Sequence, residues 1–236
     1  PRSKEHEVYD FIYSELEEIK DDLEPNNASK TRANTFAALA LESRAMLYAA
    51  SLAKYNNLMA SPITTPNGEV GIPSGMANDY YTKSLTASQA IIDSENYSLY
   101  NANPDKGRNF YEMLMRKGNE EVIFAKDFLR DLKGQWFTFD NIPRSFTQDN
   151  EGSSMLSPSL SLIESFDYLD GSEGTLLDKN GDGEYIVYDN INDIFENKDG
   201  RLYGTVIYPG TTFQNTPVNI QAGVAVWEDD HYELRV

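Results

Sequence analysis

The sequence predicts a mainly α fold in which paired helices pack against an irregular region with short helices and a few short strands. Three stretches in the first hundred residues carry apolar side chains at spacings of three and four, which is the helical period. None of the three contains Gly or Pro. The remaining residues hold only short apolar runs that are closed by turn signals. We therefore expect one domain over residues 1–236, with a helical-repeat part at 1–100 and an irregular, ligand-binding part at 101–236.

Residues 34–56 predict the central helix of this domain. The stretch is rich in Ala, Leu and Met, which are strong helix formers. Asn34 or Thr35 suits the N-cap, since its side-chain oxygen accepts an unpaired backbone N–H. The helix is apolar around much of its circumference, which is typical of a central element. The stripe expected to be buried consists of Phe36, Leu39, Ala40, Leu47, Ala50 and Ala53.

Two flanking helices are predicted at residues 5–24 and 79–93. The first ends before Pro25, and the second is expected to be capped by Asn78 or Asp79. Three antiparallel helices of this kind predict tetratricopeptide-like hairpins. The regular repeat period is absent because the connection at 58–78 is too long, so this interpretation depends on helix pairing alone.

The later elements are shorter. We expect a helix at 110–117 closed by Gly118 in the left-handed region, and a helix from Pro158 to about Leu169. Short strands are predicted over 121–125, 201–208 and 217–221, the last two pairing through Pro209–Gly210. No period holds over 132–157.

Several motifs follow one another in a specific order. An acidic helix precedes Lys30-Thr-Arg-Ala-Asn34 and an Ala-rich helix, and Asn119-Glu-Glu-Val-Ile-Phe124 follows. This order resembles the SusD/RagB family of nutrient-binding outer-membrane lipoproteins of Bacteroidetes. Residues 157–171 resemble the family's helix that leads into an Asp-Gly turn, and 194–202 resemble its Phe-x-Asn-Arg-Asp-Pro-Arg-Leu segment. Lys198 replaces Arg there, and Gly200 replaces Pro. The similarity spans nearly the whole chain in the family's order.

This resemblance implies a SusD-like fold and a non-catalytic function. Such a protein binds a glycan or another nutrient at the cell surface and delivers it to a SusC-like TonB-dependent transporter. The helical repeats are expected to form the partner surface, while the irregular segments carry the ligand. A lipid anchor outside this chain attaches such proteins to the outer membrane. We expect the chain to be an internal fragment, because the family's leader, lipidated Cys and earlier helical pair are missing.

The charge excludes several classes of partner. The chain has 38 acidic and 20 basic residues, a net charge of −18. Nucleic acid is bound mainly by Lys and Arg, so an acidic chain disfavours it, and a polybasic membrane patch is disfavoured as well. The chain contains no Cys and therefore no thiolate metal site. No apolar run is expected to span a bilayer.

Trp136 is the predicted ligand-binding aromatic residue. It lies in an aromatic, turn-rich segment with Gln135, Asn141 and Arg144 nearby. The C–H face of a sugar ring stacks on an aromatic ring, and amide and guanidinium groups bind its hydroxyls. The alternative, in which Trp136 belongs to the core, is equally open, because most aromatic residues are buried.

Residues 178–189 place oxygen side chains at the positions that a calcium-binding loop uses. The predicted ligands are Asp178, Asn180, Asp182 and Asp189. Three features depart from such a loop. Position 12 of the loop is Asp189 rather than a bidentate Glu, and position 8 is Tyr185, where Ile is usual. No flanking helices are evident. An Asx-rich turn before the short strand 185–188 is the alternative. We expect no cofactor to be required, and calcium is the one ion that the sequence suggests.

Two other functions stay open at this point. A glycoside hydrolase would need a pair of carboxylates, and the chain supplies Glu164, Asp167, Asp170, Asp193 and Asp199. A helical-repeat interaction module would bind no small ligand. An exposed aromatic platform distinguishes the nutrient-binding function from the interaction module.

Overall fold

The computed structural model describes residues 2–25, 28–129, 131–143, 146, 155–190, 192–213, 215–218, 224–228 and 231–235. The chain divides into two compact units. The first contains Pro1–Leu99 with Lys117–Asp127, and the second contains Tyr100–Arg116 with Phe128–Val236. Residues 117–127, placed by the sequence in the irregular part, thus pack with the helices. The predicted mainly α fold is confirmed.

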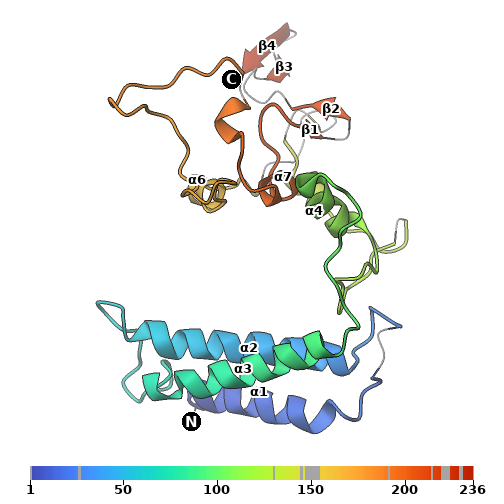
Figure 1. Cartoon of the computed structure of the whole chain (residues 1–236), viewed down its shortest axis with the longest axis vertical. Coiled ribbons are helices and arrows are strands. Elements are labelled where there is room, and N and C mark those ends of the chain that lie inside the picture. The colour runs from blue at the N-terminus through green and yellow to red at the C-terminus, as the bar shows by residue number, and fades with distance from the viewer. Residues whose placement is uncertain are drawn as a thin grey trace. The chain divides into compact units, whose positions relative to one another are not determined.

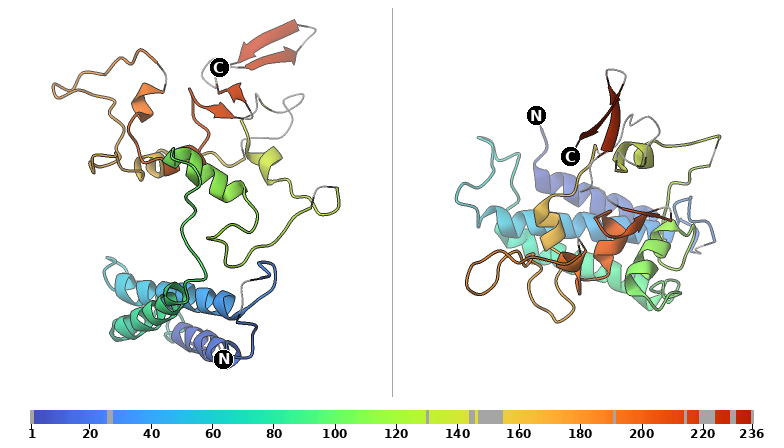
Figure 2. Two further views of the ribbon diagram at one scale, coloured as in Figure 1. Left: turned by 45° about the vertical axis from the view of Figure 1, so that its right-hand side comes forward. Right: turned by 90° about the horizontal axis from the view of Figure 1, so that it is seen from above.

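The first unit is a bundle of three antiparallel helices (Figures 1 and 2). They are α1 (Glu5–Ile19), α2 (Thr35–Asn56) and α3 (Ala77–Asp93), and the 3-10 turn η1 (Ser74–Met76) leads into α3. Helix α2 packs against both α1 and α3. The prediction that residues 34–56 form the central helix is therefore confirmed.

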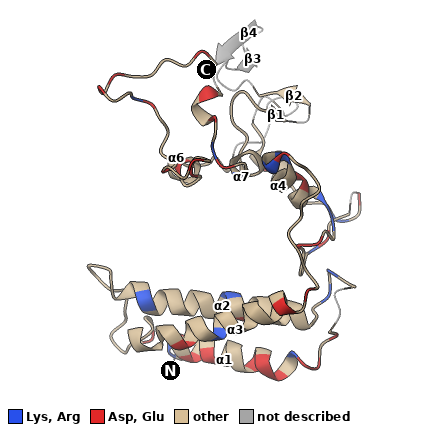
Figure 3. Cartoon of the chain, viewed as in Figure 1, with Lys and Arg blue, Asp and Glu red and all other residues tan. Residues whose placement is uncertain are grey.

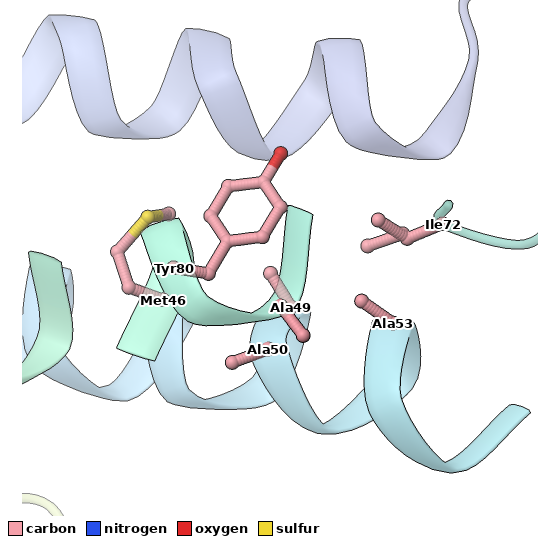
Figure 4. Close-up of a cluster of buried hydrophobic side chains, with 7 residues drawn as sticks. Met46, Ala49, Ala50, Ala53, Ile72 and Tyr80 are labelled. Carbon is pink, nitrogen blue, oxygen red and sulfur yellow. The ribbon is translucent and has the colours of Figure 1, made fainter. Parts of the chain in front are cut away.

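The core of this unit is built around small residues of α2. Met46, Ala49, Ala50 and Ala53 are buried against Tyr80 of α3. Figure 4 shows these side chains, with the Tyr80 hydroxyl pointing toward α1. The alanines keep the surface of α2 thin, so the Tyr80 ring fits between the helices.

The predicted burial of Leu47 is wrong. Its side chain is 50% exposed, whereas Met46 beside it is 0% exposed. Both neighbouring helices pack on the side of α2 that carries Glu42, Met46 and Ala49, which leaves Leu47 on the far side. A helix that is apolar around much of its circumference does not reveal from its sequence which side its neighbours cover.

The helix ends are set by specific hydrogen bonds. Asn34 caps α2 as predicted, since its Oδ1 accepts from the Ala37 N–H at 2.8 Å. Helix α1 ends at Ile19, before the predicted residue 24, and Thr35 Oγ1 donates to the carbonyl of Lys20 at 3.1 Å. The predicted cap of α3 is wrong, because α3 begins at Ala77. Asp79 instead forms an ion pair with Lys83 one turn later, at 2.8 Å.

Helix α2 is the one helix in the described part of the chain that is long and apolar enough to cross a membrane, by length and composition only. The expectation that no such run exists is therefore corrected. Eight of its residues are buried in the three-helix unit, which is the arrangement of a core helix. Figure 3 shows how few charged residues α2 carries.

The second unit consists of short elements. Its helices are α4 (Lys106–Met115), α5 (Phe137–Asn141), α6 (Leu160–Glu164) and α7 (Arg201–Thr205), with the 3-10 turn η4 (Asp193–Phe195). Its antiparallel strand pairs are β1 (Thr212–Phe213) with β2 (Thr216–Pro217), and β3 (Val224–Glu228) with β4 (His231–Arg235). A small core of Ile163, Leu202 and Val206 lies between α6 and α7.

Several predictions for this unit are wrong. Residues 201–205 form α7 rather than a strand, and Leu202 in the middle of that turn is buried. The helix expected over 158–169 ends at Glu164. Just beyond it, the buried ammonium group of Lys198 donates a hydrogen bond to the carbonyl of Phe166. Residues 121–125 contain no strand.

Three further predictions concern α5, strand β2 and Gly118. A short helix, α5, interrupts the stretch in which no period was found. Strand β2 pairs with β1, not with residues 201–208, and residues 219–221 lie outside the described residues. Gly118 takes the left-handed conformation at φ 62°, but it does not close the helix as predicted, because α4 ends at Met115 with Arg116 as its C-cap.

Candidate functional site

The first candidate site is an exposed aromatic segment formed by Trp136, Phe137 and Phe139 at the start of α5. Trp136 occupies the N-cap position, and its carbonyl accepts the first helical bond from Asp140 at 2.9 Å. Its side chain is 72% exposed. The ring meets Phe139 edge to face, with centroids 5.6 Å apart and an interplanar angle of 78°. The core alternative for Trp136 therefore does not hold.

Gln135 and Asn141 hold the backbone around this segment. Gln135 Oε1 accepts from the Phe137 N–H at 2.5 Å, and Asn141 Nδ2 donates to the Phe137 carbonyl at 2.7 Å. Asn141 Oδ1 also accepts from the Leu156 N–H at 2.9 Å. These amides fix the turn that presents the Trp136 ring. Their role as direct ligand contacts stays a prediction, and Arg144 lies outside the described residues.

A second candidate site is a pocket of about 360 Å³ between α4, α7 and β1, called here the α4–α7 pocket. Glycines let the two helices approach closely. A Cβ added at Gly200 would lie 2.8 Å from the backbone nitrogen of Gly107, and one added at Gly204 would lie 2.6 Å from Phe110. The close approach brings side chains of both helices to one opening.

Aromatic rings and one cation line the α4–α7 pocket. Tyr111 of α4 and Tyr203 of α7 meet edge to face at 6.3 Å, and Phe213 of β1 belongs to the same lining. Arg108 also lines it, with Nε donating to Glu112 Oε1 at 3.2 Å. Glu112 is the main cause that raises the pKa of Arg108, and Tyr203 adds to it.

A third candidate is an open pocket of about 850 Å³ formed by residues from 168 to 197, called here the acidic pocket. Tyr168 and Tyr188 supply aromatic surface. Its carboxylates come from Asp170, Glu173, Asp193 and Glu196, and no Lys or Arg is among its described lining residues. A lining of this charge favours neutral or cationic ligands.

Lys198 contacts Tyr168, one of the residues that line the acidic pocket. Its side chain is 6% exposed, and its Nζ donates to the carbonyls of Phe166, at 2.7 Å, and Gly174. The same Nζ lies 4.4 Å from the ring centroid of Tyr168. Burial lowers the pKa of Lys198, whereas the nearby charges of Glu164 and Asp167 act in the opposite direction. Lys198 thereby fixes the backbone on which Tyr168 is presented.

The carboxylates named as hydrolase candidates are mostly engaged close to their own position in the chain. Asp170 accepts from the backbone and hydroxyl of Ser172 at 2.9 and 2.6 Å, and Asp193 accepts from the Asn190 N–H at 3.1 Å. Asp199 pairs with Arg201 at 2.5 Å, which lowers the pKa of Asp199. Each of these three groups stabilises a turn or a helix start.

The predicted calcium loop forms a tight turn. Asn180 Oδ1 accepts from the N–H groups of both Asp182 and Glu184 at 3.0 Å, and Gly183 takes the left-handed conformation at φ 82°. Lys179 and Tyr185 form an isolated bridge across the turn. No group of three or more acidic or histidine side chains is arranged around a metal position in the residues that the structure describes. Calcium binding by Asp178, Asn180, Asp182 and Asp189 stays a prediction.

Sequence patterns did not find Arg108, Tyr111 or Tyr203. Nothing in their local spacing distinguishes them from surface residues of short helices, because the pocket arises from the glycine contact between α4 and α7. The signal that was available is Gly200, which departs from the motif that the segment 194–202 resembles.

Residues 120–233, just under half of the chain, match the protein-family model described as the SusD family. No curated protein matches the chain. The matched region contains the exposed aromatic segment, the acidic pocket and the loop at 178–189. Arg108 and the helices of the first unit precede it.

Proposed function

Because this chain is a SusD/RagB-like protein, we propose that it binds a glycan or another nutrient at the cell surface and delivers it to a SusC-like TonB-dependent transporter. The family consists of binding proteins rather than catalysts. In this proposal the first unit contacts the transporter, and the second unit holds the nutrient. A lipid tether outside residues 1–236 keeps the protein at the outer membrane.

The observation that carries this proposal is the exposure of Trp136. A large apolar ring that is 72% exposed leaves most of its hydrophobic surface in water. Stacking a sugar on that surface would remove it from water, which is favourable. The amides of Gln135 and Asn141 hold the ring's backbone in place before binding, so little ordering cost remains. An exposed aromatic platform favours nutrient binding over a module that binds no small ligand.

A glycoside hydrolase is the less well supported alternative. Such an enzyme needs two carboxylates across one reacting bond, one of them held protonated by its surroundings. Asp170 and Asp199 accept strong local hydrogen bonds instead, and these lower the pKa of both groups. A carboxyl group with a lowered pKa stays ionised and has no proton to donate, so Asp170 and Asp199 are poor candidates for a general acid.

The exposed side of α2 supports the transporter contact. Leu41, Tyr48 and Tyr55 follow one another at spacings of seven on this helix, and all three are exposed. That spacing places them on one face, opposite the core. An apolar helix face of this kind is typical of a surface that another protein covers.

A glycan-array screen of the full-length protein tests the proposal directly, with Trp136→Ala as the site variant. We expect a defined set of glycans to bind wild type and to bind the variant more weakly. Co-purification with the transporter tests the delivery step, using Tyr48→Glu on the exposed side of α2. Unchanged co-purification of that variant would exclude this face as the contact.

A further inference from the structure

We propose that the α4–α7 pocket is a second ligand site that takes a sugar acid, meaning a polyhydroxylated ring that carries a carboxylate. This goes beyond the proposed nutrient site, which uses Trp136. Three independent features of the lining define the ligand: its aromatic walls, its hydroxyl groups and its single cation.

The walls fit one ring with an apolar face. The volume of about 360 Å³ suits a small molecule rather than a long chain. Tyr111 and Tyr203 stand edge to face, and Phe213 is supported by an edge-to-face contact with Phe146 at 5.4 Å. Rings that are held by other rings keep their orientation when a ligand arrives.

Two threonine hydroxyls of the lining favour hydrogen-bond donors on the ligand. Thr205 Oγ1 donates to the Arg201 carbonyl at 2.8 Å, and Thr211 Oγ1 donates to the Tyr208 carbonyl at 2.7 Å. A hydroxyl has one hydrogen and two lone pairs. Each threonine has used its hydrogen within the protein, so its oxygen can only accept from a ligand. Ligand hydroxyls meet this requirement.

The cation favours a negative group on the ligand. Arg108 is the one charged side chain among the described residues that line the pocket. Its bond to Glu112 uses Nε, and Asn103 Nδ2 donates to the same Glu112 oxygen at 3.2 Å. This chain of contacts orients the guanidinium. Tyr203 also forms a side-chain hydrogen bond with the guanidinium. The two Nη groups carry four hydrogens in a planar fork, and the hydrogens that Tyr203 does not use can bind a carboxylate.

The two pockets of the second unit differ in charge. Four carboxylates and no described cation line the acidic pocket, whereas one Arg and no described carboxylate line the α4–α7 pocket. In a chain of net charge −18, a carboxylate ligand is repelled by most of the surface. The α4–α7 pocket is the one of the two whose lining is compatible with it.

The test compares glucuronate and galacturonate with their methyl esters, which lack the negative charge and carry one added methyl group. Binding is measured by calorimetry on the whole chain at fixed ionic strength. We expect at least one acid to bind about tenfold or more tightly than its ester, the size of one charge-assisted hydrogen bond. Arg108→Gln should abolish this preference. Arg108→Lys, which keeps a charge but loses the planar fork, should reduce it.

Two controls separate this site from its surroundings. Arg44→Gln removes the same charge from an exposed position of α2 and should leave the preference intact. Trp136→Ala should weaken binding at the proposed nutrient site and leave the acid preference unchanged, so the two proposals fail separately. The ion pair between Arg108 and Glu112 is accessible to solvent, so removing it by substitution of Arg108 should barely alter the melting temperature. Equal binding of acid and ester, an Arg108→Gln variant that keeps the preference, or its loss in Trp136→Ala would each overturn the second site.

Discussion

The hydroxyl of Tyr80, on α3, donates a 2.9 Å hydrogen bond to Asp10 of α1 across the core of the first unit. The Tyr80 ring is completely buried, and burial followed by the Asp10 contact raises the pKa of its hydroxyl. Tyr80→Phe keeps the ring and removes this bond. We expect the free energy of unfolding to fall by about 1–2 kcal/mol, measured by denaturant titration. Tyr48→Phe, an exposed change on α2, should leave it unaltered.

Met46 and Leu47 provide a matched pair that tests which side of α2 is buried. Met46→Ala would empty a fully buried position and should cost about 2–5 kcal/mol of unfolding free energy. Leu47→Ala changes a half-exposed side chain and should cost less than about 1 kcal/mol. Thermal and chemical unfolding of both variants measure the difference. Equal losses would show that the neighbouring helices cover α2 differently.

Glu42 predicts a pH-dependent stability in the first unit. Its side chain is 3% exposed, and Oε2 has no hydrogen-bond partner among the described residues. Burial is the main cause that raises the pKa of Glu42 to about 7, the charge of Glu17 adds to it, and Lys20 and Lys83 oppose it. Ionised Glu42 therefore costs the folded state free energy above pH 7. The cost is relieved as the pH falls toward the unfolded pKa of 4.5.

Glu42→Gln removes that cost while keeping the shape of the side chain. We expect the variant to exceed wild type in stability at pH 8, by up to about 3 kcal/mol. The difference should shrink through pH 7 to 5 and vanish below about pH 4.5. Glu15→Gln, at an exposed position of α1, is the control for removing one negative charge. A stability gap that stays constant with pH would mean that Glu42 does not titrate in this way.

Calcium binding at residues 178–189 has a direct thermal test. If Asp178, Asn180, Asp182 and Asp189 converge on an ion, millimolar calcium raises the melting temperature by mass action and a chelator reverses the rise. Asp182→Ala should lose that response. A melting curve that is the same with calcium and with chelator would leave the segment as the Asx turn that the Asn180 hydrogen bonds describe.

The helices of the first unit were predictable because their apolar period is long and uninterrupted. Asn34 was predicted correctly as the N-cap of α2, because a capping hydrogen bond depends only on residues that are adjacent in the chain. The burial of Leu47 was predicted wrongly because α2 is apolar around much of its circumference. The strand predicted over 201–208 failed for another reason. Its β-branched and aromatic residues favour a strand locally, but the burial of Leu202 against Ile163 favours a helical turn at 201–205.

The exposed aromatic segment was predictable as a candidate, and the pockets were not. Trp136 stood out because it lies in a stretch without a period. Arg108 and Tyr203 lie far apart in the chain, and they share a pocket because Gly107 and Gly200 let α4 and α7 approach closely. A contact of that kind leaves no pattern in either segment. Local reasoning can therefore name exposed rings but cannot assemble a pocket from distant residues.

The central claim is that the Trp136 ring is the nutrient-binding surface. Trp136→Ala removes an exposed ring, so its melting temperature should stay close to that of wild type. Glycan affinity should fall by about 1–3 kcal/mol, by analogy with the stacking of bases on aromatic rings. Phe11→Ala removes an exposed ring from α1, outside the aromatic segment, and is the matched control for general loss of apolar surface.

Measuring melting and glycan affinity on the same Trp136→Ala preparation is the most direct test of this account. The account predicts normal melting, a loss of affinity, and a ligand-dependent change in tryptophan fluorescence that is present in wild type and much reduced in the variant. A variant that folds normally and binds every glycan recognised by wild type with unchanged affinity would contradict it.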